Sequence, residues 1–256
     1  MSIAAGARHA ECLRALAFSD PEGELWGAAW IPPGSDAVAV VSVGAEAESV
    51  SATLEGEGPG EAWRLHIGDG ELIAEGLVEP VMEPADADPD FDQLCSVTGT
   101  VAVGGERREV DCLGWRAARS SPSLGRPDVG SVRQIAAWFG PDDGFALMAL
   151  RPVAAKGQDQ DIVSAVMFAA SEPGAVSDPR LSTTYAETGE PLRAGVELWI
   201  QDGDDPDRQF PRRAIGEATH APIRWTVDGL ALEAQPFHWH AGGRDGPGIY
   251  LLGRRA

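Results

Sequence analysis

The chain has 256 residues, enough for one large domain or for two domains that each bury a core of their own. Its formal net charge of −20 argues against nucleic acid or an anionic membrane surface as a partner, because like charges repel. Its three cysteines, Cys12, Cys95 and Cys112, are too few and too scattered for a disulfide framework or a zinc site, so we expect buried thiols.

The beginning of the chain predicts neither a leader peptide nor an anchor. It has no basic cluster ahead of an apolar core, and no apolar run is long enough to cross a bilayer. We therefore expect a cytoplasmic protein without a membrane span. Residues 8–18 place Leu13, Ala17 and Phe18 at helical intervals, which fits a short leading helix and fits a first strand equally well.

From Leu25 onward the first half reads as β-structure throughout. Short apolar runs alternate with Gly, Pro and Asp clusters at the spacing typical of barrels and sandwiches. The run at 38–43 is continuously apolar, which suits a strand buried on both faces. The acidic, proline-rich residues 79–90 are expected to form a solvated loop. The expected strands cover residues 25–31, 38–43, 50–54, 63–67 and 71–78.

A β-hairpin is the most distinct local prediction. Gly104 and Gly105 form a two-residue turn between β-rich runs within residues 97–120. The segment 120–130 that follows is rich in Pro, Gly and Ser, which marks it as a linker. We therefore expect one domain over residues 1–124 and a second over residues 125–256.

The second half repeats this organisation. Its expected strands are joined by short turns, and antiparallel strands of this kind close most readily into barrels, which leave no unpaired edge. They cover residues 132–139, 145–150, 162–170, 181–185, 195–200, 214–220 and 249–252.

Three matched anchors indicate that the two halves are duplicates. Ten residues separate Gly105 from Trp115 and also Gly229 from Trp239. In the same order, Ala-Ala-Trp recurs at residues 28–30 and 136–138, and Leu-x-Ile, followed two residues later by Asp-Gly, recurs at residues 65–67 and 198–200. Repeats of this size are whole domains.

The hairpin and the residues around it also resemble a known family. The run VTGTVAVGGERREVDCLGWR (97–116), the PDDG turn (141–144), the strand FALMAL (145–150) and the opening FSDPEGELWGAAW (18–30) are similar to the hydroxyneurosporene synthase and carotenoid hydratase family. This lipocalin-like superfamily also includes tocopherol cyclase-like proteins. The resemblance implies an all-β fold of two lipocalin-like antiparallel β-barrels in tandem, with an apolar cavity for isoprenoid or polyene substrates.

The chain departs from that family at the residues expected to carry proton transfer. Relatives continue after the hairpin with Gly, one residue and then Arg-Asp-His-Ser-Trp-Gly. Here Gly114, Trp115 and Arg116 fit this pattern, but Ala117 and Ala118 replace the Asp-His pair. A methyl group cannot donate a proton, so hydration by the family's usual route is in doubt while the fold is not.

Four titratable residues are candidates for catalysis. His238 and His240 share one face of an expected strand. They could form an acid/base pair, provide two metal ligands or simply be surface histidines. A metal needs a third donor, and no spacing supplies one, so we expect no metal and no cofactor. Asp111 and Asp92 qualify as proton donors if an apolar wall surrounds them, and otherwise as structural carboxylates.

Four further residues are candidates for substrate binding. Trp115, Trp138 and Trp239 have aromatic faces that stabilise developing carbocations, although tryptophan also fills barrels well. Arg116 either orients a substrate oxygen or forms a structural ion pair inside the barrel.

Three functions follow from these residues. The first is an enzyme of isoprenoid or polyene metabolism, of the cyclase, isomerase or hydratase type. The second is a non-catalytic carrier of a hydrophobic small molecule, and the third is a structural protein without a ligand. The partner we expect is a hydrophobic small molecule, not nucleic acid or a membrane. The substrate, the barrel that holds it and the oligomeric state stay open.

Overall fold

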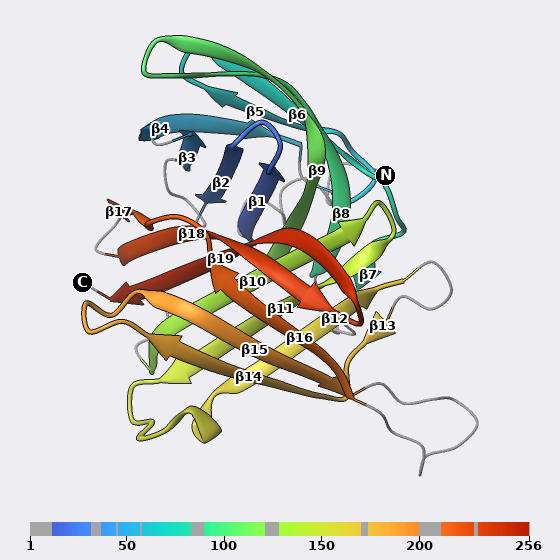
Figure 1. Ribbon diagram of the computed structural model, residues 1–256, viewed down its shortest axis with the longest axis vertical. Coiled ribbons are helices and arrows are strands. Elements are labelled where there is room, and N and C mark those ends of the chain that lie inside the picture. Colours follow the sequence, from blue (N-terminus) through green and yellow to red (C-terminus); the bar gives the residue numbers. More distant parts are fainter. Residues whose placement is uncertain are drawn as a thin grey trace, which may run out of the picture.

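The structure is a computed structural model that describes residues 12–31, 37–44, 46–56, 58–82, 90–120, 128–169, 174–199, 211–227 and 230–255. Almost all of these residues lie in β-strands, and the only helical element among them is the short 3-10 helix η1 (Gln158–Gln160). The strands form two antiparallel sheets, each rolled into a barrel (Figure 1). The predicted fold class, all-β with two lipocalin-like barrels in tandem, is confirmed.

The first half of the chain forms a closed barrel. Its strands are β1 (Cys12–Asp20), β2 (Leu25–Ile31), β3 (Ala37–Val43), β4 (Glu46–Glu55), β5 (Trp63–Ile67), β6 (Gly70–Gly76), β7 (Val81–Met82), β8 (Phe91–Val103) and β9 (Glu106–Ser120). They pair in the order β6-β5-β4-β3-β2-β1-β9-β8-β7, and β6 also pairs with β8. This last pairing closes the ring, so that the barrel has no unpaired edge.

The second half forms a barrel that is almost closed. Its strands are β10 (Val129–Gly140), β11 (Asp143–Pro152), β12 (Ile162–Phe168), β13 (Gly174–Ala175), β14 (Asp178–Tyr185), β15 (Pro191–Trp199), β16 (Pro211–Ala218), β17 (Ile223–Val227), β18 (Leu230–Ala241) and β19 (Arg244–Arg255). They pair in the order β13-β12-β11-β10-β19-β18-β16-β15-β14, with β17 beside β18. β12 and β14 approach each other, but no ladder joins these two strands.

Residues 12–20 form a strand, not a helix. Leu13, Ala15 and Ala17 point out of the first barrel, while Leu16 and Phe18 point into it, and both sets are buried. The helical intervals noted in the sequence are therefore coincidental, because apolar residues on both faces of a strand fit several periods. The hairpin prediction is confirmed: Gly104 and Gly105 join β8 to β9 with φ angles of 60° and 84°.

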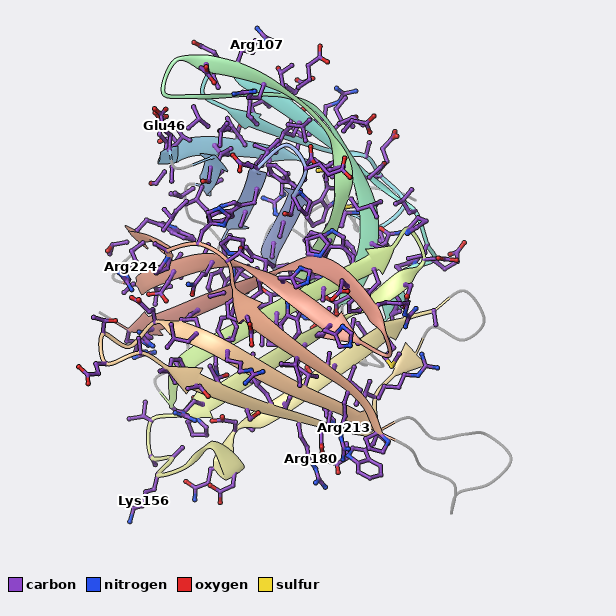
Figure 2. The ribbon with its side chains drawn as sticks, in the orientation of Figure 1. Glu46, Arg107, Lys156, Arg180, Arg213 and Arg224 are labelled. Carbon is purple, nitrogen blue, oxygen red and sulfur yellow. The ribbon has the colours of Figure 1, made fainter. Side chains whose placement is uncertain are left out.

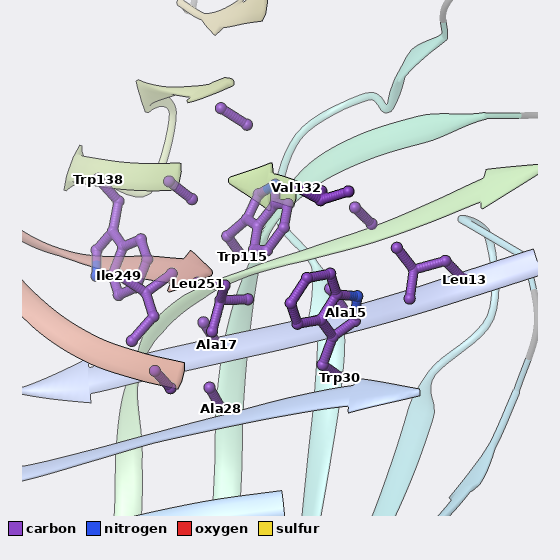
Figure 3. Packing of buried hydrophobic residues seen from close by; sticks show 14 of the residues in the cluster. Leu13, Ala15, Ala17, Ala28, Trp30, Trp115, Val132, Trp138, Ile249 and Leu251 are labelled. Carbon is purple, nitrogen blue, oxygen red and sulfur yellow. The ribbon is translucent and has the colours of Figure 1, made fainter. Parts of the chain in front are cut away.

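Buried side chains form three clusters, one inside each barrel and one between the barrels. We call the cluster between the barrels the seam. It forms where β1 and β9 of the first barrel pack against β19 and β10 of the second (Figure 3). Its buried members are Leu13, Ala15, Ala17, Trp26, Ala28, Trp30, Val40, Val81, Leu94, Trp115, Ala117, Val129, Val132, Ala136, Trp138, Ala146, Val166, Phe168, Trp225, Leu232, Ala234, Ile249 and Leu251.

The seam explains why some strands are apolar on both faces. In β2, Trp26, Ala28 and Trp30 lie in the seam, while Leu25 and Ala29 lie inside the first barrel. Every residue of β2 is buried as a result. Charged side chains gather on the outer surface instead, where Glu46, Arg107, Lys156 and Arg213 extend away from the barrels (Figure 2).

Two of the three anchors behind the predicted duplication lie on strands that do not correspond. In each barrel the first strand pairs with the last, β1 with β9 and β10 with β19. Trp30 lies on the second strand of the first barrel, whereas Trp138 lies on the first strand of the second barrel. Trp115 lies on the last strand of the first barrel, whereas Trp239 lies on the next-to-last strand of the second. The like topology of the barrels is real, but these tryptophans are not equivalent. The anchors on β5 and β15 do correspond.

Several predicted features lie outside the described residues. These are the division between residues 124 and 125, residues 121–127 of the linker, and residues 83–89 of the acidic loop. None of the helices in the described ranges is long and apolar enough to span a membrane.

Cys12, Cys95 and Cys112 are free thiols, and burial raises the pKa of Cys95 and of Cys112 to about 12.

Candidate functional site

A recess of ≈ 590 Å³ lies at one end of the first barrel, and Arg116 from β9 forms part of its wall. Gln93 from β8 and the segments 59–62 and 75–80 complete the lining. Arg116 points into the barrel because its register partner Gln93 lies on the same inner face. It is 1% exposed, and its guanidinium lies 5.3 Å from the centre of the Trp63 ring.

The guanidinium of Arg116 is fully occupied by protein oxygens. Nε and Nη2 donate to the Gln93 side-chain oxygen at 2.9 and 2.7 Å. Nη1 donates to the carbonyls of Glu61 and Ala74 at 2.6 and 3.1 Å, and Nη2 also donates to that of Pro59 at 2.6 Å. An arginine has five N–H donors, and all five have acceptors here. The hydrogen bonds of Arg116 therefore connect three segments at the end of the barrel. Desolvation lowers the pKa of Arg116.

A second buried polar group lies on the opposite face of the same two strands. Asp92 is 0% exposed and faces the seam. Its Oδ1 accepts a hydrogen bond from Trp115 Nε1 at 2.9 Å, and its Oδ2 accepts one from Arg119 Nη2. Sequence reasoning proposed Asp92 and Trp115 separately, and the structure brings them into contact. The sequence did not point to Arg119, because its partner Asp92 lies on another strand.

The alanines that replace the family's Asp-His pair lie at the centre of this arrangement. Ala117 is the register partner of Asp92, so the two side chains share the seam face. Ala118 is the partner of Phe91 and points into the first barrel. Asp92 thus places a carboxylate beside Ala117, on the neighbouring strand.

The three candidate tryptophans occupy two different places. Trp115 and Trp138 both lie in the seam, together with Trp30 (Figure 3). Trp239 instead lies inside the second barrel, where its ring packs edge-on against Phe145 at 5.2 Å. A Cβ atom on Gly216 would come within 2.6 Å of the Trp239 ring, which explains why a glycine stands there.

The candidate histidines lie on the outer face of the second barrel. His238 and His240 share one face, as predicted, while Phe237 and Trp239 point inward. His238 Nε2 and His240 Nδ1 contact Asp245 Oδ1 at 3.2 and 3.0 Å. Hydrogen bonds from His240 and then His238 hold the pKa of Asp245 below its ordinary value. Among the described residues, no group of three or more His, Cys, Asp or Glu side chains is arranged to hold a metal ion.

His238 nevertheless reaches a cleft between the two barrels. This cleft has a volume of ≈ 200 Å³, and it is lined by residues from β1, β2 and β18, including Trp26. Asp111, the remaining candidate, is exposed on β9 and lies neither in the seam nor in a barrel. The structure therefore brings Asp92, Trp115 and Trp138 to the seam and leaves Arg116, Trp239, His240 and Asp111 elsewhere.

No protein-family model matches the chain, and no curated protein matches it. Solved structures do match over almost its whole length. A protein assigned as an AttH from Nitrosomonas europaea is 14% identical, with a TM-score of 0.63 over 94% of this chain and 91% of that one. CghA, solved with and without Sch210972, is 11% identical, with a TM-score of 0.62 over 96% and 89%. Kievitone hydratase from Nectria haematococca is 8% identical, with a TM-score of 0.63 over 95% and 88%.

At these identities the likeness shows a common fold of two barrels. The hydroxyneurosporene synthase family stays a prediction, and so do the roles of the candidate residues.

Proposed function

We propose that the protein is an enzyme of isoprenoid or polyene metabolism, of the cyclase, isomerase or hydratase type, which binds an apolar substrate against the seam. The observation that carries this proposal is Asp92, a fully buried carboxylate in an aromatic and aliphatic cluster. Burying a charge is costly, and side chains that serve packing alone do not require one.

The chemistry available at Asp92 favours ring closure or a double-bond shift over hydration. The ion pair with Arg119 favours the ionised carboxylate, which attracts positive charge but donates no proton. In such a step bonds form and break within the substrate, so no proton enters from the protein, and the faces of Trp115 and Trp138 attract the positive charge that develops meanwhile. Ala117 and Ala118 supply no acid. Rate enhancement would come mainly from holding the substrate chain in a reactive shape.

Two hollows border residues of the seam, and we propose that a substrate enters from one of them. Val78 lines the ≈ 590 Å³ recess and also packs against the seam, whereas Gln93 in the same wall faces the interior of the first barrel, on the side of β8 opposite Asp92. The recess has the size of small-molecule pockets, roughly 300 to 1,000 Å³. The ≈ 200 Å³ cleft ends at Trp26, which is itself a seam residue.

The solved neighbours support the coarse reaction class. One is named a hydratase, and another was crystallised with a small molecule. We also propose that residues 1–124 and 125–256 are the two domains, since β9 ends at Ser120 and β10 begins at Val129.

Binding and turnover test the proposal separately. All-trans-retinol serves as a polyene probe, because it accepts energy from tryptophan, and geranylgeraniol serves as a substrate candidate whose products are separated by mass. We expect saturable energy transfer, and products of unchanged mass, which indicate cyclisation or isomerisation. A product heavier by one water would instead indicate a hydratase.

Asp92→Asn is the informative variant and Asp111→Asn its matched control. Both remove one carboxylate, but Asp111 is exposed on β9. We expect Asp92→Asn to keep retinol binding and lose turnover by about a hundredfold, as for one lost electrostatic contact. Asp111→Asn should retain both. Equal turnover in the two variants would contradict a catalytic Asp92.

A carrier without catalysis is the second candidate. It is favoured by Ala117 and Ala118, both fully buried and without a titratable group. Retinol binding by the wild type, with no change in any polyisoprenoid offered, would support the carrier over the enzyme.

A further inference from the structure

The second barrel contains a buried arginine that plays no part in the proposed function. Arg133 on β10 points into this barrel, since its neighbours two and four residues on, Ile135 and Ala137, belong to the inner cluster. It is 1% exposed. Its Nη2 donates a hydrogen bond to Asp161 Oδ2.

Asp161 is shared with a second arginine. Arg151 donates to it from Nε at 2.8 Å and from Nη2 at 3.1 Å. Burial alone would raise the pKa of Asp161, but the hydrogen bonds from Arg151 and Arg133 outweigh burial and lower it. The cluster therefore has two guanidinium groups and one carboxylate, which leaves one positive charge in excess.

The donors of Arg133 are only partly used. Among the described residues, neither Nε nor Nη1 has a hydrogen-bond acceptor. Leaving a buried donor unpaired costs about 1 to 3 kcal/mol, and more when the group is charged. Arg116 in the first barrel, with every N–H group satisfied, shows that this fold can pair a buried guanidinium completely.

Three hydroxyl groups lie beside this guanidinium. Tyr250 is diagonal to Arg133 on the paired strand, since Arg133 pairs with Leu252 and Ile135 with Tyr250. The Tyr250 hydroxyl lies 3.1 Å from Thr183 Oγ1 and 3.4 Å from the Tyr185 hydroxyl. Burial raises the pKa of Tyr250, so its proton is retained at neutral pH and can be donated.

The cluster lies beside the gap in the second barrel. No ladder joins β12 to β14, and the cluster lies at the ends of these strands. Asp161 directly precedes β12, and Tyr185 is the last residue of β14. The side chain of Arg151 is 32% exposed, which brings the cluster to the surface.

We propose that this end of the second barrel binds a small monovalent carboxylate, of the size of formate or acetate, between Arg133 and Tyr250. A single negative charge cancels the excess positive charge, and carboxylate oxygens accept from the free guanidinium donors and from a hydroxyl group. The ligand is small because Phe145, Phe237 and Trp239 pack the barrel beyond Tyr250. This site is separate from the seam, and it stands whether or not the seam binds a substrate.

The full-length protein can be tested by thermal unfolding in sodium formate. Ionic strength is held constant with sodium gluconate, a carboxylate too large for this position. A ligand that binds the native state raises the melting temperature by mass action. We expect a saturating rise of roughly 5 °C at about a hundredfold excess over Kd.

Variants then locate the binding. Arg133→Met should abolish the rise, and Tyr250→Phe should weaken formate about tenfold, as for one hydrogen bond to a charged group. Arg213→Gln is the control, because it removes a charge from an exposed arginine outside the barrel and should leave the response unchanged (Figure 2).

Three results would overturn the proposal. They are an unsaturable effect of formate, a rise of equal size in gluconate, or a wild-type response in folded Arg133→Met. If Arg133→Met does not fold, Tyr250→Phe decides, and a wild-type affinity in that variant would count against the site.

Discussion

Arg116 and Arg133 differ in a way that separates the two barrels. Both are 1% exposed, and both point into a barrel. Arg116 has no carboxylate partner but gives all five donors to oxygens of Gln93 and of three backbone carbonyls. Arg133 has a carboxylate partner, yet its Nε and Nη1 find no acceptor in the described residues. The first barrel thus pairs the Arg116 guanidinium completely, whereas the second leaves two donors of Arg133 without an acceptor among the described residues.

Topology accounts for this difference. The first barrel is closed by the pairing of β6 with β8, and the segments that supply acceptors to Arg116 fold over its end. The second barrel has no ladder between β12 and β14, and Asp161, the partner of Arg133, directly precedes β12 beside this gap. The closed first barrel therefore serves as a scaffold for the seam. The gap in the second barrel favours binding of the small carboxylate proposed at Arg133.

The largest expected loss of stability is in Asp92→Asn, which acts on a third buried arginine, Arg119. Asp92→Asn removes the carboxylate that faces it in the seam. Breaking a buried ion pair from one side costs about 4 kcal/mol, because the remaining charge stays desolvated. Urea unfolding followed by tryptophan fluorescence measures this loss. A loss below about 1 kcal/mol would mean that the seam admits water at this position.

Arg116→Met should have the next largest effect. It leaves the Gln93 side-chain oxygen and the carbonyls of Pro59, Glu61 and Ala74 without their donor. We expect a loss of about 3 kcal/mol in the free energy of unfolding, since each buried acceptor left unpaired costs about 1 kcal/mol or more. Chemical denaturation provides the value. A loss no larger than that of Arg133→Met would show that Arg116 is no better paired in its barrel than Arg133.

Arg133→Met should cost less, about 1 kcal/mol, in buffer without small carboxylates. The substitution removes a charge whose donors are only partly paired, and Asp161 keeps both hydrogen bonds from Arg151. The same urea titration measures it beside Arg116→Met. A loss of 3 kcal/mol or more would show that Arg133 is as well satisfied as Arg116.

The smallest effect is expected at the exposed cluster of His238, His240 and Asp245. His240→Gln removes the main cause of the lowered pKa of Asp245, so this pKa should rise toward its ordinary value. Because the folded-state pKa is the lower one, the stabilisation exists above the unfolded pKa and fades as pH falls through the folded value. Carboxyl chemical shifts followed by NMR report the pKa. An unchanged pKa in His240→Gln would show that the contact is absent in solution.

The sequence predicts the barrels well because their signals are local. Turn residues such as Gly104 and Gly105, and strands buried on both faces such as 38–43, are recognised without knowledge of partners. The alternation that separates His238 from Trp239 is equally local.

The site is predicted less well because it depends on which face of each strand meets the other barrel. Nothing in the sequence around Trp115 and Trp239 reveals that one lies in the seam and the other inside a barrel. Arg119 and Arg133 were missed because their partners, Asp92 and Asp161, lie 27 and 28 residues away. The register that joins Asp92 to Ala117 becomes visible only once β8 and β9 are paired.

A crystal structure of the complex with all-trans-retinol would show whether an apolar substrate binds against the seam at Asp92. We expect the polyene between the barrels, in contact with Trp115 and Trp138 and entering from the recess that Val78 lines. A polyene held inside the second barrel against Trp239, or on the outer face at His240, would contradict it.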